Sequence, residues 1–101
     1  MKINEVKRGM SGVSVEGRIT EKSTSRRVKT RYGQRSVADA TLEDETGTIR
    51  LSLWEEQIDM VNWGDEVKIT GAYVTDFRNS LQLTIPRSGK LEVAKQNVFK
   101  L

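Results

Sequence analysis

The chain has 101 residues, of which 36% are hydrophobic and 31% are charged, and this length suits one domain, residues 1–101, with one modest core. It contains no cysteine and no histidine, which excludes disulfides, thiolate nucleophiles and the commonest metal ligand and general base. No apolar stretch approaches the roughly 18 residues of a membrane span, and no signal-peptide pattern opens the chain. We therefore expect a soluble, cytoplasmic, non-enzymatic domain that needs no cofactor or metal.

The net charge of +3 is concentrated in one segment. Residues 22–35 contain six basic side chains and no acidic one, so 11 basic and 14 acidic residues remain elsewhere, a charge of −3. Such a segment is either a solvated loop or a surface that faces an anion, such as the phosphates of a nucleic acid. The six residues are Lys22, Arg26, Arg27, Lys29, Arg31 and Arg35.

Alternation of apolar and polar residues predicts β-strands along most of the chain. A first strand is expected over about residues 12–23, where Gly17 indicates a bulge or a sharp bend. The basic segment follows as a loop, or as a ribbon that turns at Tyr32-Gly33. A second strand is expected over residues 37–43, where alanine and leucine alternate with polar side chains.

The middle of the chain continues this pattern. The run Asp44-Glu45-Thr46-Gly47 has the composition of a tight turn, and a third strand follows over residues 49–54. Residues 55–61 show helical spacing and predict one or two turns of helix. Gly64 stands where a glycine would cap the end of that helix.

The last part predicts two more strands and a short extension of the sheet. The fourth strand runs over residues 66–77, and a tight turn at Arg78-Asn79-Ser80 leads to a fifth strand that ends at Pro86. A segment at residues 91–93 extends the sheet, whereas residues 1–11 and 94–101 are expected to be peripheral. This order predicts an all-β, five-stranded antiparallel OB-fold barrel with a short helical segment between strands 3 and 4. The first-to-second and fourth-to-fifth loops of such a barrel flank its ligand face.

Trp54 has an unusual position for a large aromatic residue. Ile49 and Leu51 take the inward parity of the third strand, whereas Trp54 shares the outward parity of Arg50 and Ser52. Either the strand ends here and the indole folds over the end of the barrel, or the indole is a platform on which a base can stack.

Tyr73 and Phe77 lie four residues apart on the fourth strand and therefore on one face. In a regular strand they would share the inward parity of Ile69 and belong to the core. A bulge at Gly71 would reverse the parity and turn both rings outward. The residues alone leave both alternatives open.

Two other aromatic residues are given structural roles. Trp63, just before Gly64, is expected to cover the end of the barrel, and Tyr32 is expected to be a turn residue. Arg50, beside Trp54, and Arg78, in the last turn, join the basic segment as candidate contacts to phosphates.

The run from Val37 to Trp54, VADATLEDETGTIRLSLW, resembles the second and third strands of archaeal single-OB single-stranded DNA-binding proteins. These proteins are related to the DNA-binding domains of replication protein A and to the small human single-stranded DNA-binding proteins. The likeness continues through GDEVKI at residues 64–69, GAYVTDF at 71–77 and LQL at 81–83, and it covers about residues 5–95. The acid-Thr-Gly turn before a strand that ends in tryptophan is its most specific part.

The resemblance implies roles for particular residues. In that family an aromatic residue at the end of the third strand and two on the fourth stack on bases, and these positions fall on Trp54, Tyr73 and Phe77. The resemblance therefore favours the bulge at Gly71. Some archaeal members carry a Gly-rich, acid-ended tail that recruits partner proteins, and this sequence ends at Leu101 without one, so recruitment through such a tail is not expected.

These features predict sequence-tolerant binding and protection of single-stranded DNA in replication, recombination and repair, by base stacking and phosphate contacts. Single-stranded RNA or tRNA binding stays open as an alternative, as does a protein-interaction subunit whose aromatic face docks another chain. Catalysis is disfavoured because the carboxylates show no convergent pair. The expected partners are single-stranded DNA and replication or repair proteins, and the candidate binding residues are Trp54, Tyr73, Phe77, Arg26, Arg27, Lys29, Arg31, Arg35, Arg50 and Arg78.

Overall fold

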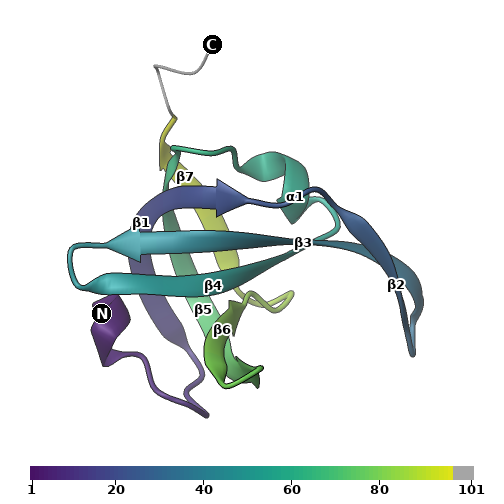
Figure 1. Ribbon diagram of the computed structural model, residues 1–101, viewed down its shortest axis with the longest axis horizontal. Helices are drawn as coiled ribbons and strands as arrows, with labels where there is room; N and C mark the ends of the chain where they lie inside the picture. Colours follow the sequence, from purple (N-terminus) through teal and green to yellow (C-terminus); the bar gives the residue numbers. More distant parts are fainter. Residues whose placement is uncertain (97–101) are drawn as a thin grey trace.

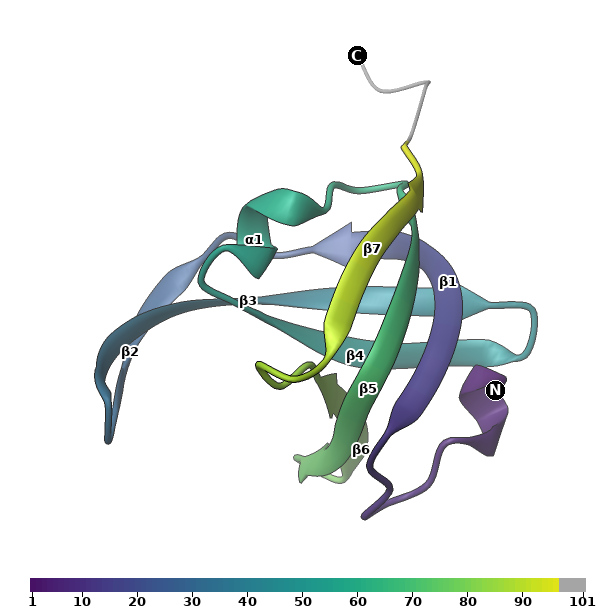
Figure 2. The same ribbon diagram turned by 180° about the vertical axis from the view of Figure 1, so that it is seen from behind.

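Five strands close into a ring by pairing in the order β1-β3-β4-β6-β5 and back to β1 (Figure 1). The computed structural model describes residues 1–96. Outside the ring, β2 pairs with β3 and β7 pairs with β5, and the view from behind shows β7 lying along β5 (Figure 2). In chain order the elements are η1 (Ile3–Glu5), β1 (Val13–Lys22), β2 (Arg26–Thr30), β3 (Gly33–Asp44), β4 (Gly47–Trp54), α1 (Gln57–Met60), β5 (Glu66–Phe77), β6 (Ser80–Thr84) and β7 (Lys90–Lys95).

The ring contains one parallel pair, β4 with β6, which corrects the prediction of a wholly antiparallel barrel. The other four pairs of the ring are antiparallel. A closed ring with an odd number of strands cannot reverse direction at every step, so at least one neighbouring pair must run the same way. The predicted OB-fold is otherwise confirmed, with β1, β3, β4, β5 and β6 as its five strands and α1 between β4 and β5.

The predicted strands agree closely with the observed ones. The basic segment adopts the ribbon alternative, in which β2 pairs with the first half of β3 and the chain turns at Arg31-Tyr32. The predicted turn at residues 78–80 is confirmed as a two-residue hairpin loop, because Phe77 pairs with Ser80. The predicted sheet extension at residues 91–93 is part of β7. Residues 97–101 of the segment predicted to be peripheral lie outside the described residues.

A bulge at Gly71 reverses the parity of β5. The backbone there is left-handed, with φ of +77°, and the pairing between β1 and β5 advances three residues on β5 for two on β1. Ile69 points into the barrel before the bulge and Ala72 does so after it. Tyr73 and Phe77 are therefore outside the barrel, with 38% and 37% of their surfaces exposed, so the bulge alternative is confirmed.

The N-terminal segment, predicted to be peripheral, contributes to the core. Ile3 in η1 and Val6 after it are buried against the closed end of the barrel near β4. The backbone N–H of Ile3 donates to the Asp44 carboxylate at 2.8 Å, which ties η1 to the turn between β3 and β4. Patterning along the chain missed this contact because the two residues are 41 positions apart.

The segment after β4 contains one short helix, but it ends differently from the prediction. Val61 follows α1 in an extended conformation and its side chain enters the core. Gly64, predicted to cap the helix, instead takes φ of +88° in a turn between Asn62 and Asp65. Trp63, predicted to cover the end of the barrel, is 61% exposed, because the buried Val61 already fills the core beneath this segment.

Gly17 lies where β1 changes partners, from β5 to β3, as the predicted bend at a barrel corner requires. A Cβ atom at position 17 would lie 2.5 Å from the carbonyl oxygen of Glu43. The backbones of β1 and β3 therefore approach each other more closely here than a residue with a side chain at position 17 would permit. The register shifts of β1 lie on either side of Gly17 rather than at it.

Replacing Gly17 by alanine is expected to destabilise the protein by about 1–3 kcal/mol, because the new methyl group forces the two backbones apart. Chemical denaturation measures this loss. The control is Glu16→Ala on the same strand, which alters an exposed side chain and is expected to change stability by less than about 0.5 kcal/mol. Equal stability of the two variants would contradict the close approach.

The Asp44 carboxylate provides a second test, through pH. Burial raises the pKa of Asp44, but hydrogen bonds from Thr46 Oγ1 and from the N–H groups of Ile3, Thr46 and Gly47 outweigh it and lower the pKa to about 2. Since its ordinary value is 3.8, the stabilisation is complete above that pH and is lost as the pH falls through about 2.

Asp44→Asn is expected to reduce stability at neutral pH by about 1–3 kcal/mol, since hydrogen bonds to a charged acceptor become bonds to a neutral one. The variant should also show a shallower loss of stability between pH of about 4 and about 2. Urea denaturation midpoints measured across this range test both effects. A variant with the same acid dependence as the wild type would contradict the assignment.

Candidate nucleic-acid interface

The outer face of β3, β4, β6 and β5 carries the predicted aromatic residues. Strand registers align their outward side chains in rows across the sheet, with neighbouring strands about 5 Å apart. One row contains Tyr73, Thr84, Ser52 and Asp39, and the next contains Thr75, Gln82, Arg50 and Thr41. Trp54 lies two residues beyond Ser52 on β4, and Phe77 lies two residues beyond Thr75 on β5. The three aromatic residues therefore stand at separate points of one face.

A groove of about 530 Å³ lies between this face and the β2–β3 ribbon. Trp54 and Tyr73 line it from the barrel, and Arg31 and Arg35 line it from the ribbon. The remaining lining residues are Thr30, Tyr32, Glu56, Gln57, Thr84, Ile85, Pro86 and Arg87. The groove thus combines aromatic rings with arginines, and Glu56 is the acidic residue in its lining.

The surroundings of Trp54 fix its position. Its backbone N–H donates to the side-chain oxygen of Gln57 at 3.0 Å, and the Gln57 amide in turn donates to the carbonyl of Ile85 at 3.4 Å. The Arg35 guanidinium lies 5.9 Å from the centroid of the indole ring, and its Nε donates to Glu55 at 3.1 Å. Trp54 is half-buried, so one part of the indole packs and the rest faces the groove.

Phe77 lies between two arginines at the other end of the face. The guanidinium carbons of Arg50 and Arg78 are 4.9 Å and 5.2 Å from its ring centroid, within the range of cation–π interaction. Arg50 also pairs with Asp39 at 3.3 Å, and Asp39 pairs with Arg26 at 3.0 Å. Two of the predicted arginines are therefore held in place by one carboxylate.

Pairing of β2 with β3 divides the basic residues of the ribbon between two faces. Arg26 is opposite Val37, which in turn is opposite Trp54, so Arg26 shares the face of the aromatic residues. Arg35 has the same parity and lines the groove. Arg27 and Lys29 have the other parity and lie on the back of the ribbon. The sequence predicted one basic segment, either a loop or a ribbon, and only the strand pairing shows which of its residues share a face.

Several groove residues were not predicted from the sequence. Arg87, Thr84 and Gln57 line the groove with Trp54, and Gln82 lies beside Arg50 on the outer face. Thr84 and Gln82 could have been found from their outward parity on the predicted fifth strand. Arg87 follows Pro86 in a loop, and no local pattern connects it with residues more than 30 positions earlier.

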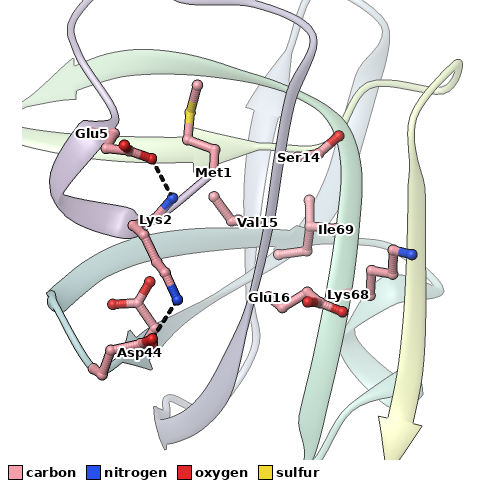
Figure 3. A pocket seen from close by; sticks show the side chains of 10 residues that line it. Met1, Lys2, Glu5, Ser14, Val15, Glu16, Asp44, Lys68 and Ile69 are labelled. Carbon is pink, nitrogen blue, oxygen red and sulfur yellow. Dashed lines mark hydrogen bonds and ion pairs between the residues drawn. The ribbon is translucent and has the colours of Figure 1, made fainter.

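A second hollow, of about 590 Å³, lies on the far side of the barrel between η1, β1 and β5. Figure 3 shows the side chains of Glu5, Glu16 and Asp44 around it. Glu45 completes this acidic lining and forms an ion pair with Lys2, whose side-chain hydrogen bond lowers the pKa of Glu45 and raises that of Lys2. Its lining has four carboxylates beside Lys2 and Lys68, so this hollow is less suited to phosphates than the groove.

The described part of the chain has no helix long and apolar enough to cross a membrane. It also contains no group of three or more histidine, cysteine, aspartate or glutamate side chains that could hold a metal ion.

Replacing Tyr73 or Phe77 by alanine is expected to cost less than about 1 kcal/mol of stability, because more than a third of each ring is exposed. The matched control is Leu51→Ala on β4, which removes a fully buried side chain and is expected to cost about 2–5 kcal/mol. Thermal or urea denaturation of the three variants measures this. A loss in the Tyr73 or Phe77 variant as large as in the Leu51 variant would contradict the outward placement.

Comparison with known proteins agrees with this architecture. A family model described as single-stranded DNA binding protein Ssb-like, OB fold, matches residues 6–93. The single-stranded DNA binding protein Ssb of Saccharolobus solfataricus is 33% identical over 98 residues, which are 97% of this chain and 66% of that protein. Replication factor A of Methanothermobacter thermautotrophicus is 36% identical over 80 residues, 78% of this chain but 10% of that protein. The chain thus spans only part of each relative.

Solved structures show the same fold. The OB domain of Ta0387 from Thermoplasma acidophilum superimposes with a TM-score of 0.82 at 29% identity, covering 100% of this chain and 92% of that one. The second OB-fold domain of replication protein A from Methanococcus maripaludis gives a TM-score of 0.78 at 22% identity, covering 97% of both chains. At that lower identity the likeness concerns the fold alone.

Proposed function

The chain belongs to the family of Ssb-like single-stranded DNA binding proteins with an OB fold, and we propose that it binds single-stranded DNA without sequence preference. The observation that carries this proposal is the outward placement of Trp54, Tyr73 and Phe77 on one face, next to arginines. Every base has a flat π-face, so stacking on such rings tolerates any sequence. The family consists of binding proteins, and the proposed function is likewise binding without catalysis.

The three rings and the arginines have separate tasks in this proposal. Trp54 and Tyr73 stack on bases inside the groove, and Phe77 stacks on a base at the other end of the face. Arg31, Arg35 and Arg87 lie around the groove, where they contact the phosphates that leave it. Arg50 and Arg78 do the same around Phe77, and Arg26 does so beside Asp39, whose ion pairs hold Arg26 and Arg50 in position.

The cellular role extends from this binding. We propose that residues 1–101 act as one nucleic-acid-binding domain that protects single-stranded DNA in replication, recombination and repair, associated with the nucleoid. A domain that covers exposed bases competes with a complementary strand and with nucleases for access to the bound strand. Replication or repair proteins that act on the same strand are the partners that this role implies.

Titration with a single-stranded oligonucleotide tests the function. We expect the DNA to quench the fluorescence of Trp54 in a Trp63→Phe protein, and the slope of log K against log[salt] to be roughly −2 to −3.5 for three to five phosphate contacts. Trp54→Ala should weaken binding by about 1–3 kcal/mol, the contribution of one stacked base. Trp63→Phe is the control, and it should bind as the wild type does because Trp63 does not line the groove.

Two outcomes would overturn the proposal. Unchanged affinity in Trp54→Ala would remove the stacking role of the groove. Binding that does not depend on salt would favour a face that docks another protein. Titration with RNA of the same sequence decides between the two nucleic acids, since RNA binding tighter than DNA binding would make RNA the ligand in place of DNA.

A further inference from the structure

The back of the β2–β3 ribbon is a cationic surface that the proposed single-strand groove does not use. The ribbon projects from the barrel in both views, and the barrel does not cover its back (Figures 1 and 2). Arg27 and Lys29 stand on this side, two residues apart on β2 and roughly 7 Å from each other along the strand. Their cross-strand neighbours are Ser36 and Gln34. The back is therefore entirely polar and carries two positive charges.

These two cations differ in their partners from Arg26 and Arg35, the two arginines on the front of the ribbon strands. Arg26 and Arg35, on the front, pair with Asp39 and Glu55 respectively. Among residues 1–96, Arg27 and Lys29 form no ion pair, and Arg27 donates only a long hydrogen bond of 3.4 Å to Gln34. A cation without an internal carboxylate is available to an external anion at no cost in broken ion pairs.

The chemistry of the back fits phosphates and not bases. It has no aromatic or aliphatic side chain on which a base could stack, whereas the front has Val28, Trp54 and the groove. Double-stranded DNA presents phosphates at twice the axial density of one strand and hides its bases within the stack. A two-stranded β-ribbon is also one of the elements that fit against a duplex.

We propose that the back of the ribbon binds the phosphate backbone of double-stranded DNA adjoining the bound single strand, so that the protein prefers a single-strand–duplex junction to a uniform single strand. The inference rests on the proposed function, because the groove on the front holds the single strand. The tip of the ribbon lines the groove, so a strand that leaves the groove past Arg31 and Tyr32 passes from the front of the ribbon to its back. Tyr32, 80% exposed at that tip, stands where the duplex would begin.

The test uses the whole chain and four DNAs, titrated by fluorescence anisotropy. They are a single strand long enough for one protein, the same strand continued into a hairpin duplex at its 5′ end, the same strand continued into that duplex at its 3′ end, and the hairpin alone. If Arg27 and Lys29 each neutralise one duplex phosphate, the salt slope for a junction should be steeper by about 1.8 than for the single strand. The preference for the junction should then grow roughly tenfold when the salt concentration falls fourfold.

Two variants that each remove two positive charges separate the faces. Arg27→Ala/Lys29→Ala should bind the single strand within about twofold of the wild type and lose the junction preference and its extra salt slope. Arg31→Ala/Arg35→Ala should weaken binding to both DNAs and keep the ratio between them. Arg27→Gln/Lys29→Gln repeats the first variant with the length of the side chains largely retained, and melting temperatures within a few degrees of the wild type confirm folding.

The results that would contradict the proposal can be told apart from one another. A wild-type protein that binds the single strand but shows no junction preference has no duplex site. Equal weakening of both DNAs in Arg27→Ala/Lys29→Ala would place those residues on the path of the single strand. Failure of the wild type to bind the single strand at all would instead reject the proposed function, and tight binding of the hairpin alone would make duplex DNA the primary ligand.

Discussion

The left-handed backbone at Gly71 determines the character of the binding face. It inserts one extra residue into β5, so Val67 and Ile69 fill the barrel below it while Ala72 and Val74 fill the barrel above it. The same residue permits a close contact with a second glycine, since a Cβ atom at Gly71 would lie 3.2 Å from the Cα of Gly89. The loop between β6 and β7 therefore passes close to the bulge of β5, and it brings Ile85 and Arg87 to the wall of the groove. The bulge at Gly71 thus turns the two rings of β5 outward and allows the loop between β6 and β7 to pack beside β5.

Carboxylates beside the arginines reduce the positive charge of this face and hold the arginines in position. Asp39 holds Arg26 and Arg50, and Glu55 holds Arg35, in partly exposed ion pairs that contribute little to stability. Their effect is on geometry, since an arginine fixed over an aromatic ring loses less freedom when a phosphate arrives. The carboxylates also lower the net positive potential of the face. A polyanion that offers no bases is therefore expected to bind weakly. In the proposed function, the face therefore selects for a ligand that presents phosphates and unstacked bases together.

Local patterns in the sequence predicted the strands and the tight turns, because alternation with a period of two is imposed residue by residue. They also identified Gly71, since a glycine inside a strand marks a bulge, although choosing between an inward and an outward Tyr73 required the family resemblance. Contacts between distant parts of the chain were not accessible in this way. The anchoring of Ile3 to Asp44, the parallel pairing of β4 with β6 and the arrival of Arg87 beside Trp54 all depend on closure of the barrel. The two faces of the ribbon depend on one register, which the charges alone do not specify.

The division of charge along the sequence becomes a division in space once the barrel closes. Four carboxylates line the hollow at η1, β1 and β5 beside Lys2 and Lys68, whereas Arg31, Arg35 and Arg87 line the groove on the other side beside Glu56. In the proposed function, the excess of carboxylates on the first surface and of arginines on the second turns the aromatic face toward an approaching strand. The long strand β3 links the two poles, since it runs from the cationic ribbon at one end to the Asp44 turn at the other. In the proposed function, the acidic body therefore contributes to binding by orienting the encounter, without touching the ligand.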